Sequence, residues 1–431
     1  MAVDELITAL SGSGFSSFEL YSEEIIEDSV SFRANHFYSL GRRERQGYGI
    51  RVIKDGRIGF MSGTEVDLLT REIRTIRPTT TTRIRFPGPD RYEEVDSFHD
   101  TVSGWPVDKL IQFGKRMIEA LADLEPRMKL EVAVTRRMIR YMIKNSGGLD
   151  QSYDQLIAYL WVEGQLVYDH HIRYIYDFVN ISEGQEPDYG GVRRYFGMII
   201  RNLKREVRTP PGSYPVIIMP IPLSTIITGI TVGINGKSLD RGYSPLTDKI
   251  GKKVVSEKVT VYDDGLRPFG FRSGPFDGEG VARKKRVIFD KGVFKNFLFD
   301  LETGAKRGLP STGNAQRSYS SLPSPGPNNL VMEPGHGDLD QTISGIDRGI
   351  IVCGVVGGGH GNIYAGDFSV KLDLGFLIEK GEIRGRLTET MMAGNIYNVL
   401  LNVIEIGDYQ KDLGGEYLPW ILTSELNFTA S

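Results

Sequence analysis

The residues that could do chemistry in this chain gather in polar, glycine-containing loops of its second half. Three such loops contain the runs FDGEG, STGNAQR and GDFS. Loops of this composition either bind a peptide through hydrogen bonds or close tight turns, and the sequence leaves both roles open. The candidate groove residues are Asp277, Glu279, Asn314, Arg317, Asp367 and Ser369.

The motifs of well-known catalytic sites are missing from the sequence. There is no HExxH, CxxC or GxSxG, and the run TVGINGKS lacks the first glycine of a phosphate-binding loop. A zinc site built from His336, His360 and Cys353 would need the fold to bring all three together, and we do not expect this. His170 and His171 are adjacent, so in a strand their rings point to opposite faces and share no metal. The roles of Cys353 and His360 remain open.

Charge and cysteine content narrow the class of partners. The chain has 52 basic and 55 acidic residues, so its net charge of −3 gives no electrostatic push toward nucleic acid. The basic runs RNLKREVR and RKKR are interpreted as solvated surface. A single cysteine excludes an internal disulfide framework and suits the reducing cytoplasm. The N-terminal run MAVDELITAL is too short and too acidic for a signal peptide, so none is expected.

The stretch from Thr209 to Gly236 contains no charged residue, although a quarter of the chain is charged. It could be a membrane span, the core of a second domain or the floor of an active site. Its prolines, glycines and hydroxyl residues argue against a membrane helix. We predict a buried strand at Val216–Met219, a proline turn, and a buried helix from Leu223 to Ile234.

Hydrophobic periodicity predicts the elements that must position these loops. Strands with a hairpin at Lys54-Asp55-Gly56 come first, and helices are predicted over 107–121 and 192–207. The break after Arg208 predicts two domains, residues 1–208 and 209–431. The second is richer in glycine and short β runs, with helices predicted only over 223–234, 339–345 and 394–404. The fold class is therefore α+β, with an N-terminal sheet-and-helix domain followed by a β-rich, barrel-like domain.

The polar runs, taken together and in order, resemble the TldD/PmbA family. FDGEGV, STGNAQR, GGGHGNIYAGDFS and MMAGN occur in the family's order and spacing, as do FELYSEE at the start, the KDGRIG hairpin and RGYS at 241–244. The resemblance covers nearly the whole chain. The resemblance implies that the chain is related to intracellular metallopeptidases that trim peptides. This family was formerly described as modulators of DNA gyrase. One branch carries a zinc site, and the PmbA/TldE branch pairs with it.

The resemblance also implies where zinc would be bound. The zinc branch places HExxxH on the helix after a strand like Val216–Met219, with a cysteine ligand near the C-terminus. Here Thr228, Gly229 and Gly233 occupy the HExxxH positions, and residues 404–419 contain no cysteine. Thr and Gly side chains cannot bind zinc or activate water. The chain therefore resembles the PmbA/TldE branch, with zinc expected only in a TldD-like partner.

We expect a cytoplasmic binding and assembly subunit that meets a TldD-like paralogue, a second copy of itself, or both, and contacts a peptide substrate. No membrane is expected, and nucleic acid is disfavoured. Two alternatives remain: a peptidase with an unconventional site that acts as a homodimer, and a gyrase-associated modulator that binds nucleic acid.

Overall fold

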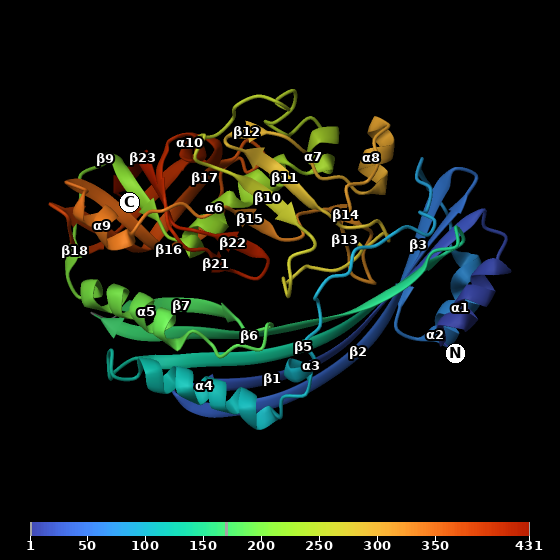
Figure 1. Cartoon of the computed structure of the whole chain (residues 1–431), viewed down its shortest axis with the longest axis horizontal. Helices are drawn as coiled ribbons and strands as arrows, with labels where there is room; N and C mark the ends of the chain where they lie inside the picture. Colours follow the sequence, from blue (N-terminus) through green and yellow to red (C-terminus); the bar gives the residue numbers. More distant parts are fainter. Residues whose placement is uncertain (1, 169–170, 431) are drawn as a thin grey trace.

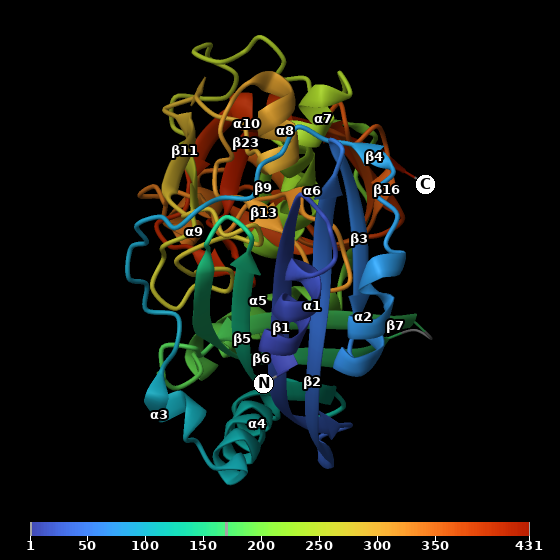
Figure 2. The same cartoon turned by 90° about the vertical axis from the view of Figure 1, so that its right-hand side faces the viewer.

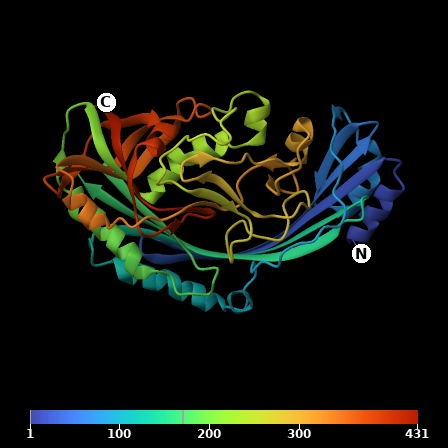
Figure 3. The same ribbon diagram turned by 45° about the horizontal axis from the view of Figure 1, so that its top comes forward.

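The first half of the chain forms one long, curved antiparallel sheet. This computed structural model describes residues 2–168 and 171–430. The sheet has the order β4-β3-β2-β1-β5-β6-β7, and it runs beneath the remainder of the molecule (Figures 1 and 3). Its strands are β1 (Ser17–Arg33), β2 (His36–Lys54), β3 (Arg57–Gly63), β4 (Thr80–Thr81), β5 (Lys129–Asn145), β6 (Asp150–Tyr168) and β7 (His171–Asn180).

The strands of this sheet are long: β1 and β5 have 17 residues each, and β2 and β6 have 19 each. The hairpin between β2 and β3 turns at Asp55 and Gly56, with φ angles of 50° and 69°. Asp and Gly tolerate this left-handed backbone, so the hairpin predicted there is confirmed. The β1–β2 pairing extends from Ser17 opposite Ile53 to Arg33 opposite His36.

Helices cover parts of this sheet. The amphipathic α4 brings Leu110, Phe113 and Met117 into one core cluster with β1, β5 and β6. Phe32 of β1 packs so closely on α4 that a Cβ at Gly114 would lie 2.2 Å from its ring. The elements are α1 (Ala2–Ser11), α2 (Val66–Glu72), η1 (Ile73–Thr75), α3 (Asp100–Ser103), α4 (Val107–Leu121) and α5 (Tyr189–Leu203).

The second half is built around a closed barrel of five strands. Strands β16, β9, β23, β19 and β17 pair in that order, and the β16–β17 pairing closes the ring. Alternate residues enter two cores: Val216 and Ile218 belong to the core cluster that contains α6, whereas Ile217 belongs to the cluster that contains residues of α4 and α5. The barrel and its flanking strands are β8 (Glu206–Val207), β9 (Gly212–Ile218), β16 (Arg348–His360), β17 (Asp367–Glu379), β18 (Glu382–Leu387), β19 (Thr390–Asn395), β20 (Val403–Ile406) and β23 (Ile421–Ala430).

Helix α6 occupies most of the uncharged stretch. It begins at Pro220 in its first turn, where a missing donor has no consequence, and ends at Gly233. The hydroxyls of Thr228 and Thr231 donate to backbone carbonyls of the same helix, which explains how polar residues fit an uncharged helix. No helix among the described residues is long and apolar enough to cross a membrane.

A second, smaller sheet (Figure 1) and short helices (Figure 2) complete this half. The sheet has the order β12-β11-β10-β15-β22-β21, and β13 pairs with β14 alone. The elements are α7 (Gly236–Asp240), β10 (Val261–Asp264), β11 (Lys285–Asp290), β12 (Val293–Phe294), α8 (Leu301–Arg307), β13 (Ala315–Gln316), β14 (Ser324–Pro325), β15 (Leu330–Met332), α9 (Leu339–Ser344), α10 (Ile396–Leu401), β21 (Lys411–Asp412) and β22 (Glu416–Leu418).

The predicted fold class, α+β with a barrel-like second half, is confirmed. The helix predicted over 192–207 is wrong at its C-terminal end: it ends at Leu203, and Glu206–Val207 instead pair with β18 of the barrel sheet. The helix predicted over 394–404 is shorter, because Gly394 and Asn395 belong to β19. Helix α8 was not predicted. The domain boundary at residue 208 stays a prediction.

We predict that α6 is a core element whose truncation is costly. Ile227→Ala removes a fully buried side chain and should lower the free energy of unfolding by about 2–5 kcal/mol. Thr231→Ala, on the half-buried side of the same helix, should cost less than about 1 kcal/mol. Urea unfolding followed by circular dichroism measures both, and equal losses would contradict the assigned orientation of α6.

Candidate functional site

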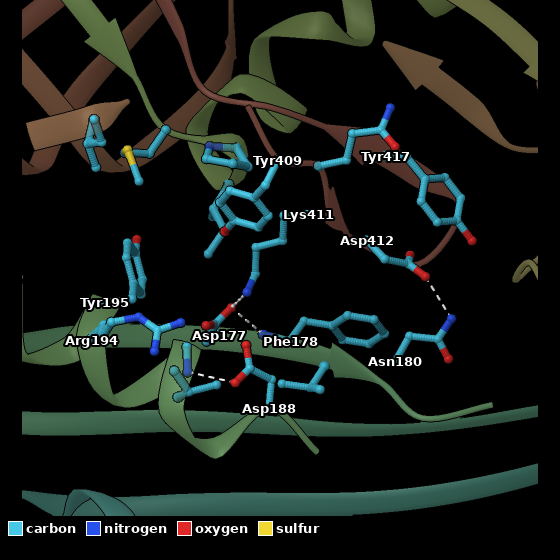
Figure 4. A pocket seen from close by; sticks show the side chains of 18 of the residues that line it. Asp177, Phe178, Asn180, Asp188, Arg194, Tyr195, Tyr409, Lys411, Asp412 and Tyr417 are labelled. Carbon is cyan, nitrogen blue, oxygen red and sulfur yellow. Dashed lines mark hydrogen bonds and ion pairs between the residues drawn. The ribbon is translucent and has the colours of Figure 1, made fainter. Parts of the chain in front are cut away.

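A cleft of about 710 Å³ separates the sheet of the first half from the second half. One wall is β7 and the exposed side of α5; the other is the β21–β22 hairpin, the start of α6 and the start of α9 (Figure 4). A volume of this size accommodates a ligand as large as a short peptide. The cleft therefore is the main candidate site among the described residues.

An ion pair crosses this cleft. The Lys411 Nζ lies 2.5 Å from Asp177 Oδ1, and the backbone N–H of Phe178 donates to the same oxygen at 2.7 Å (Figure 4). Asp177 is 1% exposed, and its Oδ2 has no hydrogen-bond partner within the described structure. Burial raises the pKa of Asp177, although Lys411 opposes the shift. The pair thus fastens the hairpin to β7.

A second cross-cleft contact lies beside the first. The Asn180 amide donates to Asp412 Oδ2 at 2.6 Å, and Asp412 Oδ1 accepts from the backbone N–H of Gly414. The aromatic side chain of Phe178 lies between the two polar contacts, and those of Tyr195 and Tyr409 also line the cleft (Figure 4). The cleft combines apolar surface with a few fixed polar groups, which is the composition of a ligand site.

The α6 positions that the family resemblance assigned to zinc binding are packed tightly. A Cβ at Gly233 would lie 2.0 Å from the Tyr397 hydroxyl oxygen, and one at Gly229 would lie 3.0 Å from the Cα of Gly366. Thr228 is half-buried, and its hydroxyl donates to Thr225 O. A larger side chain at 229 would press on Gly366 and Ile396, and one at 233 would require the Tyr397 side chain to move.

Two of the predicted groove residues belong to a buried ion-pair network between the two halves. Arg51 holds Glu19 with two hydrogen bonds, from Nε at 2.8 Å and Nη2 at 2.6 Å, and donates from Nη1 to Glu279 at 2.6 Å. Arg317 donates to the same Glu19 at 2.6 Å. Glu279 also accepts from the backbone N–H of Leu301, the first residue of α8. These contacts connect β1 and β2 to the loops of the second half.

The electrostatics of this network follow from burial and pairing. Burial alone would raise the pKa of Glu19, but Arg51 and Arg317 hold it below its usual range. Burial raises the pKa of Glu279 to about 7, against the pull of Arg51. Sequence reasoning missed Glu19 and Arg51. Their signal was a charged residue inside a strand whose neighbours are apolar, in the runs FELY and GIRVI.

Asp277 and Asn314 hold loop backbone in place. Asp277 accepts from the backbone N–H groups of Glu279, Val281 and Ala315, at 2.9 to 3.0 Å, and burial raises its pKa to about 6. Asn314 donates to Asp263 Oδ2 at 2.6 Å. Asp277 and Arg317 also border a smaller cavity of about 210 Å³ beneath Tyr21. Their role as groove residues stays a prediction.

Asp367 and Ser369 lie on β17 of the barrel. Asp367 accepts from the Asn395 amide at 2.8 Å, and Ser369 pairs with Ala393 across the strands. No hydrogen bond given for the described residues joins either of them to the ion-pair network. The six predicted residues therefore do not form a single cluster.

The structure does not bring together the residues considered as zinc ligands, His336, His360 and Cys353. Cys353 is buried in β16, His336 is exposed on the segment before α9, and the side chain of His360 lies outside the described residues, as does His170. Burial raises the pKa of Cys353 well above its usual value. Within residues 2–168 and 171–430, no group of three His, Cys, Asp or Glu side chains could hold a metal ion.

Comparison with known proteins decides the family. The model of the PmbA/TldA metallopeptidase C-terminal domain matches residues 211–430, and that of domain 1 matches residues 18–76. The chain belongs to the TldD/PmbA metallopeptidase family. The barrel half, including α6 and the β21–β22 hairpin, is the part that the family's C-terminal domain defines.

Individual relatives agree with this assignment. An uncharacterized protein of Methanocaldococcus jannaschii is 25% identical over 95% of this chain and 96% of its own length. A Metalloprotease TldD homolog of Buchnera aphidicola is 32% identical over 46% of this chain and 42% of its own length, so that match spans about half of each protein. The crystal structure of TldE from Thermococcus kodakarensis has the same fold, with a TM-score of 0.91, 24% identity and complete coverage of both chains.

We predict that the cross-cleft ion pair stabilises the closed cleft. Lys411→Met leaves the Asp177 carboxylate buried without its cation and should lower the free energy of unfolding by about 3 kcal/mol. Adding Asp177→Asn to Lys411→Met removes the stranded charge and should restore much of this loss. Thermal unfolding at pH 7 measures both, and an unchanged single variant would show that the pair contributes nothing.

The buried Asp263 gives a pH prediction. Burial raises its pKa from 3.8 to about 7, so the folded state binds a proton that the unfolded state has released between these pH values. This residue therefore lowers stability as the pH rises from about 4 to 7, and Asp263→Asn should remove that part of the decline. Urea unfolding at pH 4.5 and pH 8 tests this. An Asp263→Asn variant whose stability declines as steeply as that of the unaltered chain would contradict this assignment.

Proposed function

We propose that this chain is the non-catalytic, TldE-like subunit of a TldD/TldE-type peptidase, and that it binds peptide and completes the assembly. The observation that carries the proposal is the packing of α6. Gly229 and Gly233 stand at two of the positions where the zinc branch of the family has its metal-binding motif, and they lie so close to Gly366 and Tyr397 that a side chain at either position would require these neighbours to move. Zinc and the catalytic base would come from a TldD-like partner.

The cleft beside β7 supports a peptide-binding role. Its volume, its aromatic lining and its converging polar groups suit a short extended peptide, as the family's peptidase chemistry requires. Peptide bound there would reach the partner's zinc site only in the assembled complex. The single cysteine, Cys353, allows no internal disulfide, which suits action in a reducing compartment such as the cytoplasm.

Elemental analysis and peptide hydrolysis test the proposal. The purified chain alone should contain no stoichiometric zinc and hydrolyse no peptide. Co-expression with a paralogue that carries HExxxH should yield a complex with zinc and with peptidase activity, because the missing chemistry is then supplied. Zinc bound to the chain alone, with hydrolysis lost in His360→Ala, would instead establish the unconventional peptidase.

A further inference from the structure

The smaller cavity beneath Tyr21 lies between the first sheet and the loops of the second half, and aromatic rings form much of its wall. Its volume is about 210 Å³. The rings are those of Tyr21, Tyr141 and Tyr153 on the sheet and of Phe271 and Phe276 on the loops. Pockets that enclose a whole ligand measure roughly 300–1,000 Å³, so this cavity suits a single residue-sized group.

Three arginines and a single carboxylate also line the cavity: Arg272, Arg283, Arg317 and Asp277. The Asp277 carboxylate is held by the backbone N–H groups of three loop residues. Arg317 is paired with Glu19, and Arg272 is exposed, so water can solvate its charge. This leaves the charge of Arg283 without an anion in contact with it.

Arg283 is held in the wall of the cavity by a tyrosine and not by a carboxylate. Its Nη1 donates to the Tyr153 hydroxyl at 3.3 Å, and its guanidinium lies 6.0 Å from the centroid of the same ring. Its Nε is buried without a hydrogen-bond partner, and no salt bridge among the described residues includes it, although Asp277 attracts it from farther away. A guanidinium that is largely removed from water is costly to keep without an anion close by.

Two further side chains at this cavity have donors without a partner. The Tyr141 hydroxyl makes no hydrogen bond within the part of the chain that the structure describes. Arg317 donates from Nη1 to Glu19 and lies over the Tyr21 ring at 4.6 Å from its centroid, but its buried Nε and Nη2 have no partner there. Buried donors are nearly always hydrogen-bonded in folded proteins, so unsatisfied donors around one cavity need an acceptor.

We propose that this cavity binds the carboxylate of a residue-sized ligand with an aromatic side chain, and that Arg283, Arg317 and Tyr141 hold it. A carboxylate accepts several hydrogen bonds at once and supplies the negative charge that Arg283 lacks. The rings of the wall suit an aromatic group, because they already meet one another edge to face: the centroids of Tyr153 and Phe276 are 4.9 Å apart at an interplanar angle of 89°.

Two sources carry this chemistry, the C-terminal residue of a peptide and a free amino acid. The arginines disfavour a free amino acid, because its ammonium group would lie among like charges. We therefore expect the end of a peptide, and this choice of source rests on the proposed function. The main cleft is close by, since Phe271 of the cavity wall and Phe178 of the cleft wall have ring centroids 5.5 Å apart.

Calorimetric titration of the purified chain tests the site, which needs neither zinc nor a paralogue. N-acetylphenylalanine has the carboxylate, the ring and the amide of a peptide's last residue, and it should bind with a dissociation constant of about 1 mM or below. N-acetylphenylalaninamide has the same shape without the charge and should bind at least about tenfold more weakly. Equal binding of the two compounds, or no binding of the acid at about 10 mM, would overturn the proposal.

A pair of arginine variants separates the cavity from general positive charge. Arg283→Met removes the charge and keeps much of the side-chain length, so the affinity for N-acetylphenylalanine should fall at least about tenfold. Arg286→Met removes the same charge from the same segment but outside the cavity lining, and it should leave the affinity unchanged. Circular dichroism verifies folding. A folded Arg283→Met chain that binds the acid as tightly as the unaltered chain contradicts the site.

A tyrosine variant gives a milder test that changes neither charge nor packing. Tyr141→Phe removes one donor of the cavity, so the acid should bind at least about threefold more weakly. Tyr159→Phe, on a neighbouring strand and outside the cavity lining, is the matched control and should have no effect. Equal affinities of the two variants would remove Tyr141 from the site.

Two comparisons separate this inference from the proposed function. Free phenylalanine should bind more weakly than its N-acetyl derivative, and tighter binding would overturn the peptide end as the source of the carboxylate. If the acid does not bind and yet the chain forms an active complex with a zinc-bearing paralogue, this inference fails and the proposed function stands. If the acid binds and no such complex forms, the reverse holds.

Discussion

The buried network of Glu19, Arg51, Glu279 and Arg317 is the interaction on which the arrangement of the two halves depends. Each charge is taken out of water, so each is tolerated only while its partner stays in place. Two of the partners come from adjacent strands of the first sheet and two from loops of the second half. The ends of the loops are therefore fixed against the sheet with a geometry that apolar packing alone would not specify.

Within that frame, most of α6 is buried in the core of the second half, and only its first turn reaches the cleft. The network and Asp277 hold the loops near α8, while the Asp177–Lys411 pair holds the β21–β22 hairpin against β7. Polar groups that could have formed a catalytic centre are thus largely occupied with each other. What remains available is the cleft, whose walls come from both halves and are joined by one ion pair and one amide–carboxylate hydrogen bond.

Sequence patterns predicted the fold class, the hairpin at Asp55, the full length of α4 and most of α6, because each depends on periodicity within a short run. They could not predict that Glu19 pairs with Arg51 and Arg317, since these residues are far apart in the chain. The run FDGEG was recognised as special without its role being clear: its Asp277 satisfies three backbone N–H groups, a function that needs the folded loop to be seen. The cleft could not be predicted from the sequence for the same reason, because its walls β7 and the β21–β22 hairpin are separated by more than half the chain.

The barrel strands have a wider consequence. Because Val216 and Ile218 face one core while Ile217 faces the other, a strand such as β9 has no side left for water. The barrel wall thus separates two hydrophobic cores. When a side chain in one core changes volume and shifts the wall, the side chains of the other core must repack. Substitutions on the two sides of the wall are therefore coupled. A substitution accepted in α4 or α5 limits which side chains can pack around α6.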